Sequence, residues 1–266
     1  MIDSFGRTID YLRISVTDRC DLRCQYCMPD GGVALLPHDD ILSFEEICDF
    51  TRIAVGEGVR KVRLTGGEPL VKRSIVTLVD MLAAIDGLDE LAMTTNAQQL
   101  VEFAAPLAAA GLTRVNVSLD TTDPDRYREI TRGGDVGPAL AGIDAAIAAG
   151  LTPVKLNCVV GEWSIPTDLE SVRAFAAPRG LQVRTISHMQ FQSGEFAVVD
   201  GGTGGDCPRC NRLRLRSNGE LRPCLLSDLA WNIRELGSRE ALRCAIESKP
   251  QAGGICSHSG MHTIGG

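Results

Sequence analysis

Residues 11–27 read YLRISVTDRCDLRCQYC, an apolar, β-branched run that leads directly into Cys20, Cys24 and Cys27, spaced CxxxCxxC. Such a run predicts a first strand, with the cysteines in the loop that follows it. Because each iron of a [4Fe-4S] cluster normally takes one cysteine, three thiolates hold all of its irons but one. The remaining iron is open to a ligand that is not protein. We therefore predict an open iron–sulfur site at the end of the first strand.

Two other uses of these cysteines stay open at this point, a zinc site and a disulfide. A three-thiol zinc site usually recruits a nearby histidine, and the nearest histidine in the chain is His38. Disulfides belong mainly to small secreted domains, and Met1–Arg7 is not a secretory signal. An iron–sulfur cluster is the favoured interpretation.

The composition is typical of a soluble enzyme. The 266 residues, 44% of them hydrophobic, can bury a sizeable core, and no apolar run approaches the roughly 20 residues of a membrane span. Ten cysteines in such a chain indicate metal binding. The net charge of −7 argues against broad nucleic-acid binding but allows a local anion site. We expect a cytoplasmic protein with no membrane and no nucleic-acid partner.

Apolar, β-branched runs alternate with longer helical patterns as far as residue 188. The predicted strands are Tyr11–Thr17, Val59–Thr65, Glu90–Thr95, Arg114–Leu119, Val154–Val160 and Gln182–Ser187. The predicted helices are Ser43–Val55, Lys72–Ala84, Leu100–Ala110, Asp123–Ile130, Val136–Ala149 and Pro166–Ala177. Ser43 and Glu46 have the form of a capping box. Cys48 and Cys158 fall in a helix and a strand without a spaced partner, and we expect them to be core thiols.

This alternation predicts right-handed βαβ units and a parallel sheet. A doubly wound sheet and a partial barrel share the pattern, and the loop chemistry favours the barrel. We predict an α/β fold with a partial (β/α)6 barrel over residues 1–189 and a small C-terminal region over residues 190–266. There two short strands, Leu213–Arg216 and Glu220–Pro223, flank Asn218-Gly219, which predicts a type I′ hairpin rather than a seventh strand–helix repeat.

The hairpin region carries a second group of three cysteines, Cys207, Cys210 and Cys224. Because the chain folds back between them, we expect Cys224 to approach Cys210, and the three thiolates can hold a second [4Fe-4S] cluster whose open iron faces the barrel mouth. A structural zinc site with a fourth thiol from Cys244 or Cys256 is the alternative.

Polar residues follow several predicted strands, at the end where parallel barrels bind ligands. The sequence TGGEP comes directly after the second strand; Gly66 and Gly67 let backbone approach a ligand closely, and Glu68 offers a carboxylate to an amine. Thr94 and Ser118 stand in the same position after the third and fourth strands. Their alternative interpretation is as helix caps and turn residues.

Cations and amides alternate with apolar residues at a period of two in the strands, which places them on one face. In a barrel that face lines the lumen, where burying so many like charges without anions would cost on the order of several kcal/mol each. A polyanion such as a nucleoside triphosphate removes the conflict, and pairing with acidic side chains outside the strands is the alternative. The side chains, including two beyond the second cysteine pair, are Arg13, Lys61, Arg63, Lys155, Asn157, Arg184, Arg212 and Arg214.

The CxxxCxxC loop, with the aromatic Tyr26, resembles the signature of radical S-adenosylmethionine (SAM) enzymes. A larger set of motifs resembles the GTP 3′,8-cyclase family of molybdenum-cofactor biosynthesis within that superfamily: FGR at 5–7, YLRISVTDRC at 11–20, TGGEPL at 65–70, CNRLRL at 210–215, LRPCL at 221–225 and IGG at 264–266. The resemblance spans nearly the whole chain and includes both cysteine groups.

The resemblance implies a lyase that uses two [4Fe-4S] clusters and SAM. In this family the first cluster cleaves SAM, the 5′-deoxyadenosyl radical takes the C3′ hydrogen of GTP, and attack on guanine C8 gives 3′,8-cyclo-7,8-dihydro-GTP. The second cluster holds the guanine. By resemblance the strand cations and Asn157 bind the substrate, chiefly its triphosphate. Tyr26, the 66–68 motif, Thr94, Ser118 and Met189 bind SAM, and Arg13 and the Gly265-Gly266 tail serve catalysis.

The same resemblance implies partners and one departure. The partners are an electron donor such as flavodoxin or ferredoxin, a downstream pterin-forming enzyme and a second copy in a homodimer, and both clusters should be oxygen-sensitive. Between Met189 and Cys207 the chain has only the seventeen residues Gln190–Asp206, where the family carries a longer segment. We expect the chemistry to be retained with a more open pocket.

Two rival functions stay open. A related enzyme would act on another nucleotide, or on a peptide with its auxiliary cluster accepting electrons, although a peptide does not need so many converging cations. A non-catalytic iron–sulfur carrier would need neither the Gly66-Gly67-Glu68 motif nor the Gly-Gly tail.

Overall fold

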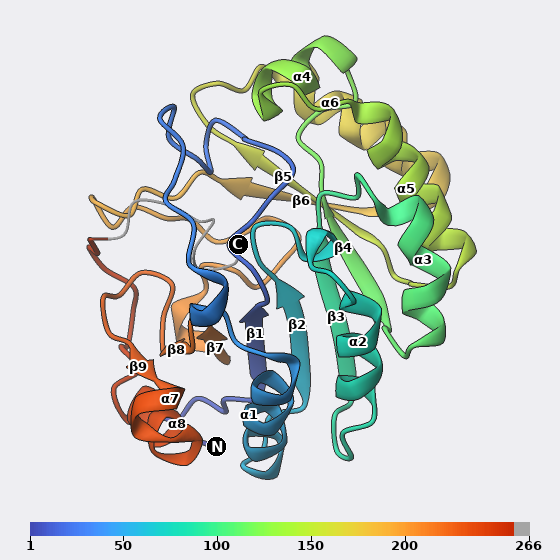
Figure 1. Ribbon diagram of the computed structural model, residues 1–266. Coiled ribbons are helices and arrows are strands. Elements are labelled where there is room, and N and C mark those ends of the chain that lie inside the picture. Colours follow the sequence, from blue (N-terminus) through green and yellow to red (C-terminus); the bar gives the residue numbers. More distant parts are fainter. Residues whose placement is uncertain (258–266) are drawn as a thin grey trace.

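The computed structural model describes residues 1–257, in which strands alternate with helices as far as residue 187 (Figure 1). Six parallel strands lie side by side in chain order: β1 (Tyr11–Ser15), β2 (Lys61–Thr65), β3 (Glu90–Thr95), β4 (Arg114–Ser118), β5 (Lys155–Val160) and β6 (Gln182–Ser187). The six predicted strands are confirmed to within a residue or two at each end.

The six predicted helices are also present, and the larger ones lie along the outer side of the sheet (Figure 1). They are α1 (Phe44–Gly56), α2 (Ile75–Ala83), α3 (Leu100–Ala109), α4 (Pro124–Thr131), α5 (Val136–Ala148) and α6 (Pro166–Ala176). The capping box of α1 is confirmed, because Ser43 Oγ accepts from Glu46 N at 3.2 Å and Ser43 N donates to Glu46 Oε2 at 2.8 Å. The predicted start of α2 at Lys72 is wrong, since Pro69–Val71 forms a short 3-10 turn and Ser74 has φ of 60°.

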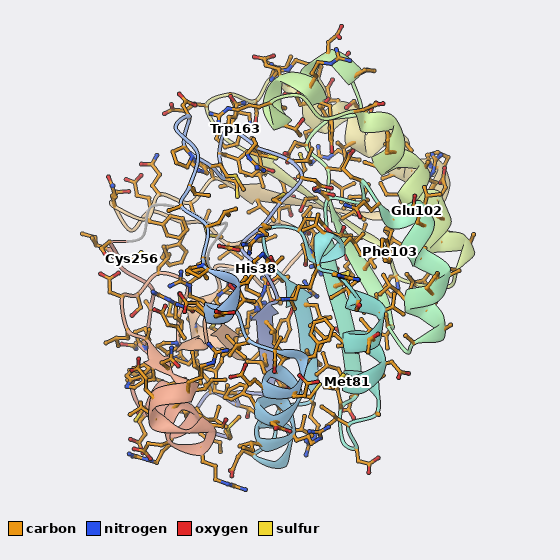
Figure 2. The ribbon with its side chains drawn as sticks, in the orientation of Figure 1. His38, Met81, Glu102, Phe103, Trp163 and Cys256 are labelled. Atoms are coloured by element: carbon orange, nitrogen blue, oxygen red, sulfur yellow. The ribbon has the colours of Figure 1, made fainter. Side chains whose placement is uncertain are left out.

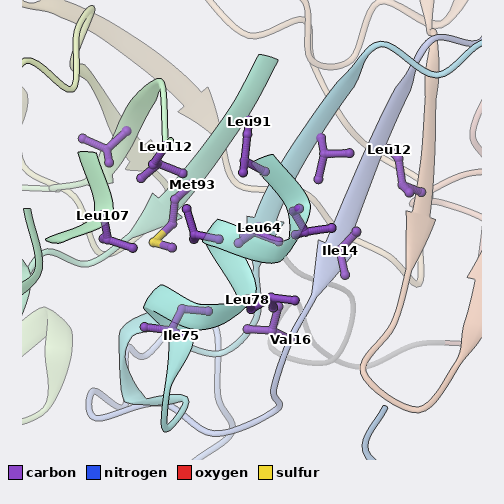
Figure 3. Close-up of a cluster of buried hydrophobic side chains, with 14 of the residues drawn as sticks. Leu12, Ile14, Val16, Leu64, Ile75, Leu78, Leu91, Met93, Leu107 and Leu112 are labelled. Atoms are coloured by element: carbon purple, nitrogen blue, oxygen red, sulfur yellow. The ribbon is translucent and has the colours of Figure 1, made fainter. Parts of the chain in front are cut away.

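The core lies between the sheet and these helices (Figure 3). Leu12 and Ile14 of β1, Leu64 of β2 and Met93 of β3 are fully buried on the helix side, in the same hydrophobic cluster as Leu78 of α2. Each such side chain contributes about 1.5–3 kcal/mol by leaving water. Because neighbouring residues of a strand point to opposite faces, this packing turns the residues between them towards the lumen.

The C-terminal region extends the same sheet. Its elements are β7 (Arg212–Leu215), β8 (Glu220–Arg222), β9 (Trp231–Asn232), α7 (Ile233–Leu236) and α8 (Ser238–Glu247). β7 pairs in parallel with β1, and β8 and β9 follow in antiparallel, so that within residues 1–257 the strand order is β6-β5-β4-β3-β2-β1-β7-β8-β9. The outer strands of this order, β6 and β9, leave the barrel open.

The predicted type I′ turn is wrong. Leu215 pairs with Leu221, and Arg216 N donates to Glu220 O at 2.8 Å, which leaves a three-residue loop. Of its residues only Gly219 has a positive φ, 86°. A three-residue loop that ends in a left-handed glycine is the next most common hairpin connection.

None of the helices in residues 1–257 is long and apolar enough to cross a membrane. The longest, α1 and α5, have 13 residues each.

Candidate active site

A cavity of about 460 Å³ runs through the lumen and is lined by both groups of cysteines. Cys20, Cys24 and Cys27 follow the carboxyl end of β1. Cys207 and Cys210 precede β7, whose first residue pairs with the first residue of β1, so they lie at the amino ends of the parallel strands. The two cysteine groups therefore stand at opposite ends of one cavity.

Most residues predicted to form the site line this cavity. Beside the six cysteines they are Arg13, Tyr26, Lys61, Arg63, Gly66, Gly67, Glu68, Thr94, Ser118, Asn157, Arg184, Met189, Arg212 and Arg214. Lys155 is not among the lining residues of the described chain, although burial and the charge of Arg184 lower its pKa. Gly265 and Gly266 lie outside the described residues.

The first cysteine group suits an iron–sulfur cluster, whose irons bring positive charge to the buried thiols. Burial raises the pKa of Cys20 to about 12, and burial together with Asp120 and the other two thiols raises that of Cys24 further. Thiolates in such a place need a cation, which bound iron supplies while it displaces the protons. No three His, Cys, Asp or Glu side chains in residues 1–257 are arranged around one metal ion. In a [4Fe-4S] cluster each cysteine binds a different iron, so the three thiols need not surround a single ion. The donor set fits a [4Fe-4S] cluster.

The glycines of the TGGEP motif pack against the cluster loop. Gly67 N donates to Thr17 O at 2.9 Å, and Glu68 N donates to Arg19 O at 2.8 Å. A Cβ on Gly66 would lie 2.7 Å from Thr17 O, and one on Gly67 would lie 2.3 Å from Arg19 O. The glycines therefore allow two backbone segments to meet next to Cys20. The sequence analysis had explained the same glycines by the close approach of a ligand.

Gly67→Ala is expected to empty the first cluster site and to cost about 1–3 kcal/mol of folding free energy, because backbone must move to admit the methyl group. Iron content and Tm measure the two effects. Gly56→Ala is the matched control, since a Cβ there meets nothing within 4 Å. Full iron loading of the Gly67 variant would contradict this role.

Glu68 is a buried carboxylate that joins β2 to the loop after β3. Its Oε1 accepts from Leu70 N at 3.0 Å and from Thr95 Oγ1 at 2.7 Å, and its Oε2 accepts from Asn96 N at 2.7 Å. Burial raises its pKa to about 7 despite these donors. Two carboxylate oxygens offer about four acceptor positions, so one stays available to a ligand in the cavity.

Tyr26, between the second and third cysteines, is fixed by its neighbours. Its hydroxyl donates to Asp120 Oδ2 at 2.8 Å, and Val159 N donates to Asp120 Oδ1 at 2.8 Å. Its ring stacks on Trp163 at 5.1 Å, and Trp163 meets His188 edge-on at 4.9 Å. Figure 2 shows Trp163 in the loop that follows β5. The cysteine loop is thus held against β4, β5 and the end of β6.

Three arginines form a row across the lumen face of neighbouring strands. Arg13 of β1 stands in register with Arg63 of β2 on one side and Arg214 of β7 on the other. Arg63 and Arg214 are 7% and 8% exposed. Burial and the charge of Arg214 lower the pKa of Arg13, and burial and the charge of Arg212 lower that of Arg214 to about 10. Like charges this close favour an anion among them.

Acidic partners lie beside two of the cations that line the cavity. Lys61 Nζ lies 4.0 Å from Asp10 Oδ2, and Arg114 forms an ion pair with Glu90. The alternative of pairing with acidic side chains outside the strands therefore holds for Lys61. Arg114 was not among the predicted cations, and its partner Glu90 is the first residue of β3.

Buried polar atoms that have no hydrogen-bond partner within residues 1–257 gather on the cavity wall. They are Tyr11 Oη, Arg63 Nε, Thr94 Oγ1, Asn116 Nδ2 and Asn157 Oδ1. A buried unsatisfied polar group costs about 1–3 kcal/mol, so a wall with five of them is built for a polar ligand.

The sequence analysis missed Glu90, Arg114 and Asn116, which also line the cavity. The signal was present, because Arg114, Asn116 and Ser118 recur at a period of two along β4. Of these three residues, the sequence analysis assigned only Ser118 to the site.

The shortened segment 190–206 forms part of the cavity wall, through Val199 and residues 202–206. Arg212 donates through Nη1 to Thr203 O at 3.2 Å and through Nη2 to Thr203 Oγ1. Arg184 Nε donates to Gly201 O at 3.2 Å. The short segment thus orients two of the cations predicted to bind substrate.

Thr203→Val is expected to raise KM for the anionic substrate about fivefold with little change in kcat, because one hydrogen bond to Arg212 is worth about 1 kcal/mol. Steady-state kinetics measure it, with Thr203→Ser expected to restore KM. Thr167→Val is the control, because Thr167 is an exposed residue of α6. An unchanged KM would mean that Thr203 does not orient Arg212.

The second cysteine group lies beside cations. Burial opposes ionisation of Cys210, but Lys249 and a hydrogen bond from the backbone of Arg212 outweigh it and lower its pKa. Burial raises the pKa of Cys224. A site that favours a thiolate at Cys210 fits a metal cluster.

The remaining cysteines are placed as follows. Cys48 and Cys158 are core thiols, as predicted, at 0% and 1% exposure. Cys244 lies on α8, with its Sγ 3.6 Å from Glu240 Oε1. Cys256 is buried with Phe191 and Leu226 in a small cluster against which Cys224 packs.

Comparisons with known proteins identify the family of the chain. The family model of the radical SAM superfamily matches residues 14–172. A GTP 3′,8-cyclase of Moorella thermoacetica is 43% identical, over 86% of this chain and 84% of the relative. That of Alkaliphilus oremlandii is 39% identical over all of both chains. The latter alignment runs over 320 positions against 266 residues here, so the relative has residues with no counterpart in this chain.

Solved structures of distant relatives show the same fold. The SuiB protein of Streptococcus suis, crystallised with S-adenosylmethionine, superposes with a TM-score of 0.64 at 16% identity, over 86% of this chain and 64% of that one. HydG, a maturase of the [FeFe]-hydrogenase, gives 0.57 at 17% identity, over 70% and 44%.

The family match covers more than half of this chain, and the similar cyclases match it nearly end to end. The chain therefore belongs to the radical SAM superfamily and, within it, to the GTP 3′,8-cyclase family.

Proposed function

We propose that this chain is a radical SAM GTP 3′,8-cyclase, a lyase that converts GTP to 3′,8-cyclo-7,8-dihydro-GTP in molybdenum-cofactor biosynthesis with two [4Fe-4S] clusters. One observation carries the proposal: a single cavity has three thiols at each end and a row of buried arginines between them. A carrier of clusters has no use for such a cavity.

At the carboxyl end of the strands, Cys20, Cys24 and Cys27 hold the first cluster in this proposal. SAM bound there supplies a 5′-deoxyadenosyl radical. Glu68 has an acceptor position left for the SAM amino group, and Thr94 has an unpaired hydroxyl on the same wall. Tyr26, Gly66, Gly67, Ser118 and Met189 complete the proposed SAM site.

The substrate lies between the two clusters in this proposal. The arginine row supports a triphosphate, because guanidinium groups bind phosphate oxygens through paired, charge-assisted hydrogen bonds. The ligand would also satisfy Arg63 Nε and Asn157 Oδ1 on the wall. The proposed substrate contacts that line the cavity are Arg13, Lys61, Arg63, Asn157, Arg184, Arg212 and Arg214, and Arg114 joins them from the structure. Lys155, which the sequence also proposes, is outside the lining residues and rests on the family resemblance.

Cys207, Cys210 and Cys224 would hold the second cluster, which would bind the guanine. The Gly265-Gly266 tail is proposed to serve catalysis together with Arg13. An electron donor of the flavodoxin or ferredoxin class, a downstream pterin-forming enzyme, a homodimer and a cytoplasmic location complete the proposal, and these rest on the family resemblance.

Anaerobic reconstitution tests the activity. With SAM, a strong reductant and GTP, we expect 5′-deoxyadenosine and the cyclised nucleotide in equal amounts. ATP in place of GTP should give only the slow cleavage seen without a nucleotide. Equal rates with and without GTP would keep the radical SAM chemistry and reject GTP as the substrate.

A further inference from the structure

Lys249 is a buried lysine outside every motif discussed above. It follows α8 and is 2% exposed. It is one of four lysines among the 27 lysine and arginine residues of the chain. Lysine is almost never fully buried unless it is paired, so the groups around its ammonium indicate what it does.

The ammonium is held by both strands that carry the second cysteine group. Lys249 Nζ donates to Arg212 O at 2.8 Å and to Pro223 O at 2.6 Å. Arg212 lies two residues after Cys210, and Pro223 immediately precedes Cys224. Two of the three hydrogens that an ammonium can donate therefore go to residues next to Cys210 and Cys224.

The third cysteine is tied to the same segment by Arg7. Arg7 Nη1 donates to Cys207 O at 2.8 Å and to Gln251 O at 3.0 Å, and Nη2 donates to Pro250 O at 2.7 Å. Residues 249–251 are therefore connected to all three cysteine-bearing stretches.

Lysine suits this place better than arginine does. Both carbonyl acceptors meet the same nitrogen atom, which a compact ammonium allows and a planar guanidinium fork does not. A buried positive charge beside a cluster also favours the cluster state with more negative charge, which is the reduced state, because the low-dielectric interior screens it weakly.

We propose that Lys249 is the positioning residue of the second cluster: it fixes Cys210 relative to Cys224 and raises the cluster's reduction potential by its charge. The inference rests on the second cluster of the proposed function.

Three substitutions separate the two effects. Lys249→Met removes the donors and the charge, and should lower iron and sulfide content towards that of one cluster. Lys249→Gln removes the charge but keeps a donor, and should retain the cluster at a more negative potential. Lys249→Arg keeps the charge but fits the acceptors less well, so it should load less of the second cluster and hold the potential of the loaded fraction near that of the wild-type protein. Lys72→Met, which removes a lysine lying over the Phe44 ring, is the control.

Iron and sulfide analysis and a redox titration followed by electron paramagnetic resonance measure these outcomes on the reconstituted full chain. The second-cluster signal is the one that Cys210→Ala removes. An unchanged potential in Lys249→Gln would overturn the role of the charge, and full loading of Lys249→Met would overturn the positioning role. Should Lys249→Met fail to fold, the glutamine and arginine variants decide. A wild-type protein without a second-cluster signal would overturn the cluster assignment and this inference with it.

Discussion

Cys24→Ala is expected to reduce 5′-deoxyadenosine below detection, whereas Cys210→Ala is expected to keep its slow formation and to abolish only the cyclised nucleotide. The two thiols lie at opposite ends of the cavity, and we assign SAM cleavage to one end and substrate binding to the other. Chromatography of both products from anaerobic reactions measures this separation. Loss of both products in both variants would contradict the division of labour.

Cys244→Ala and Cys256→Ala are the matched controls. Cys244 lies on α8 beside Glu240, and Cys256 packs with Phe191 and Leu226. If the second site is a three-thiol cluster, both variants should keep its iron content. A variant that loses the second-site metal as Cys210→Ala does would favour the four-thiol zinc alternative.

Arg63→Met is expected to raise the Kd for GTP about 30-fold or more, since losing one partner of a buried charge pair costs about 2 kcal/mol or more. In the ligand-free protein, by contrast, the same substitution is expected to stabilise the fold. Arg63 is buried among other cations, and burial with the charges of Arg114 and Arg184 lowers its pKa, so its removal should raise Tm. Isothermal titration and thermal unfolding with and without GTP measure the two effects.

Arg52→Met is the control for Arg63→Met, because Arg52 is an exposed residue of α1 paired with Asp49. It should leave Kd and Tm nearly unchanged, as exposed ion pairs contribute about 0–1 kcal/mol. A ligand-free Tm that falls in Arg63→Met would mean that Arg63 serves the fold rather than the substrate.

The strands and the cysteine groups were predictable because their signals are local. Period-two patterns in β1 and β2 gave the lumen cations, and the register between the two strands then aligns Arg13 with Arg63. Spacing alone identified both cysteine groups. The hairpin was predicted in the right place with the wrong turn, because Asn-Gly is compatible with both loop lengths.

Other parts of the site depend on contacts between distant segments, for which the sequence has no local signal. Lys249 reaches Arg212 and Pro223 across 37 and 26 residues. The glycines of TGGEP are needed by the backbone of Thr17 and Arg19, on another strand's loop. The parallel pairing of β7 with β1 joins opposite ends of the chain, and neither strand's pattern specifies its neighbour.

The most direct test of the cyclase assignment is the fate of the C3′ hydrogen of GTP. With GTP carrying deuterium at C3′, the account predicts that mass spectrometry finds the deuterium in 5′-deoxyadenosine, formed together with cyclised product that has lost it. Unlabelled deoxyadenosine, with the deuterium still on the nucleotide, would contradict the account.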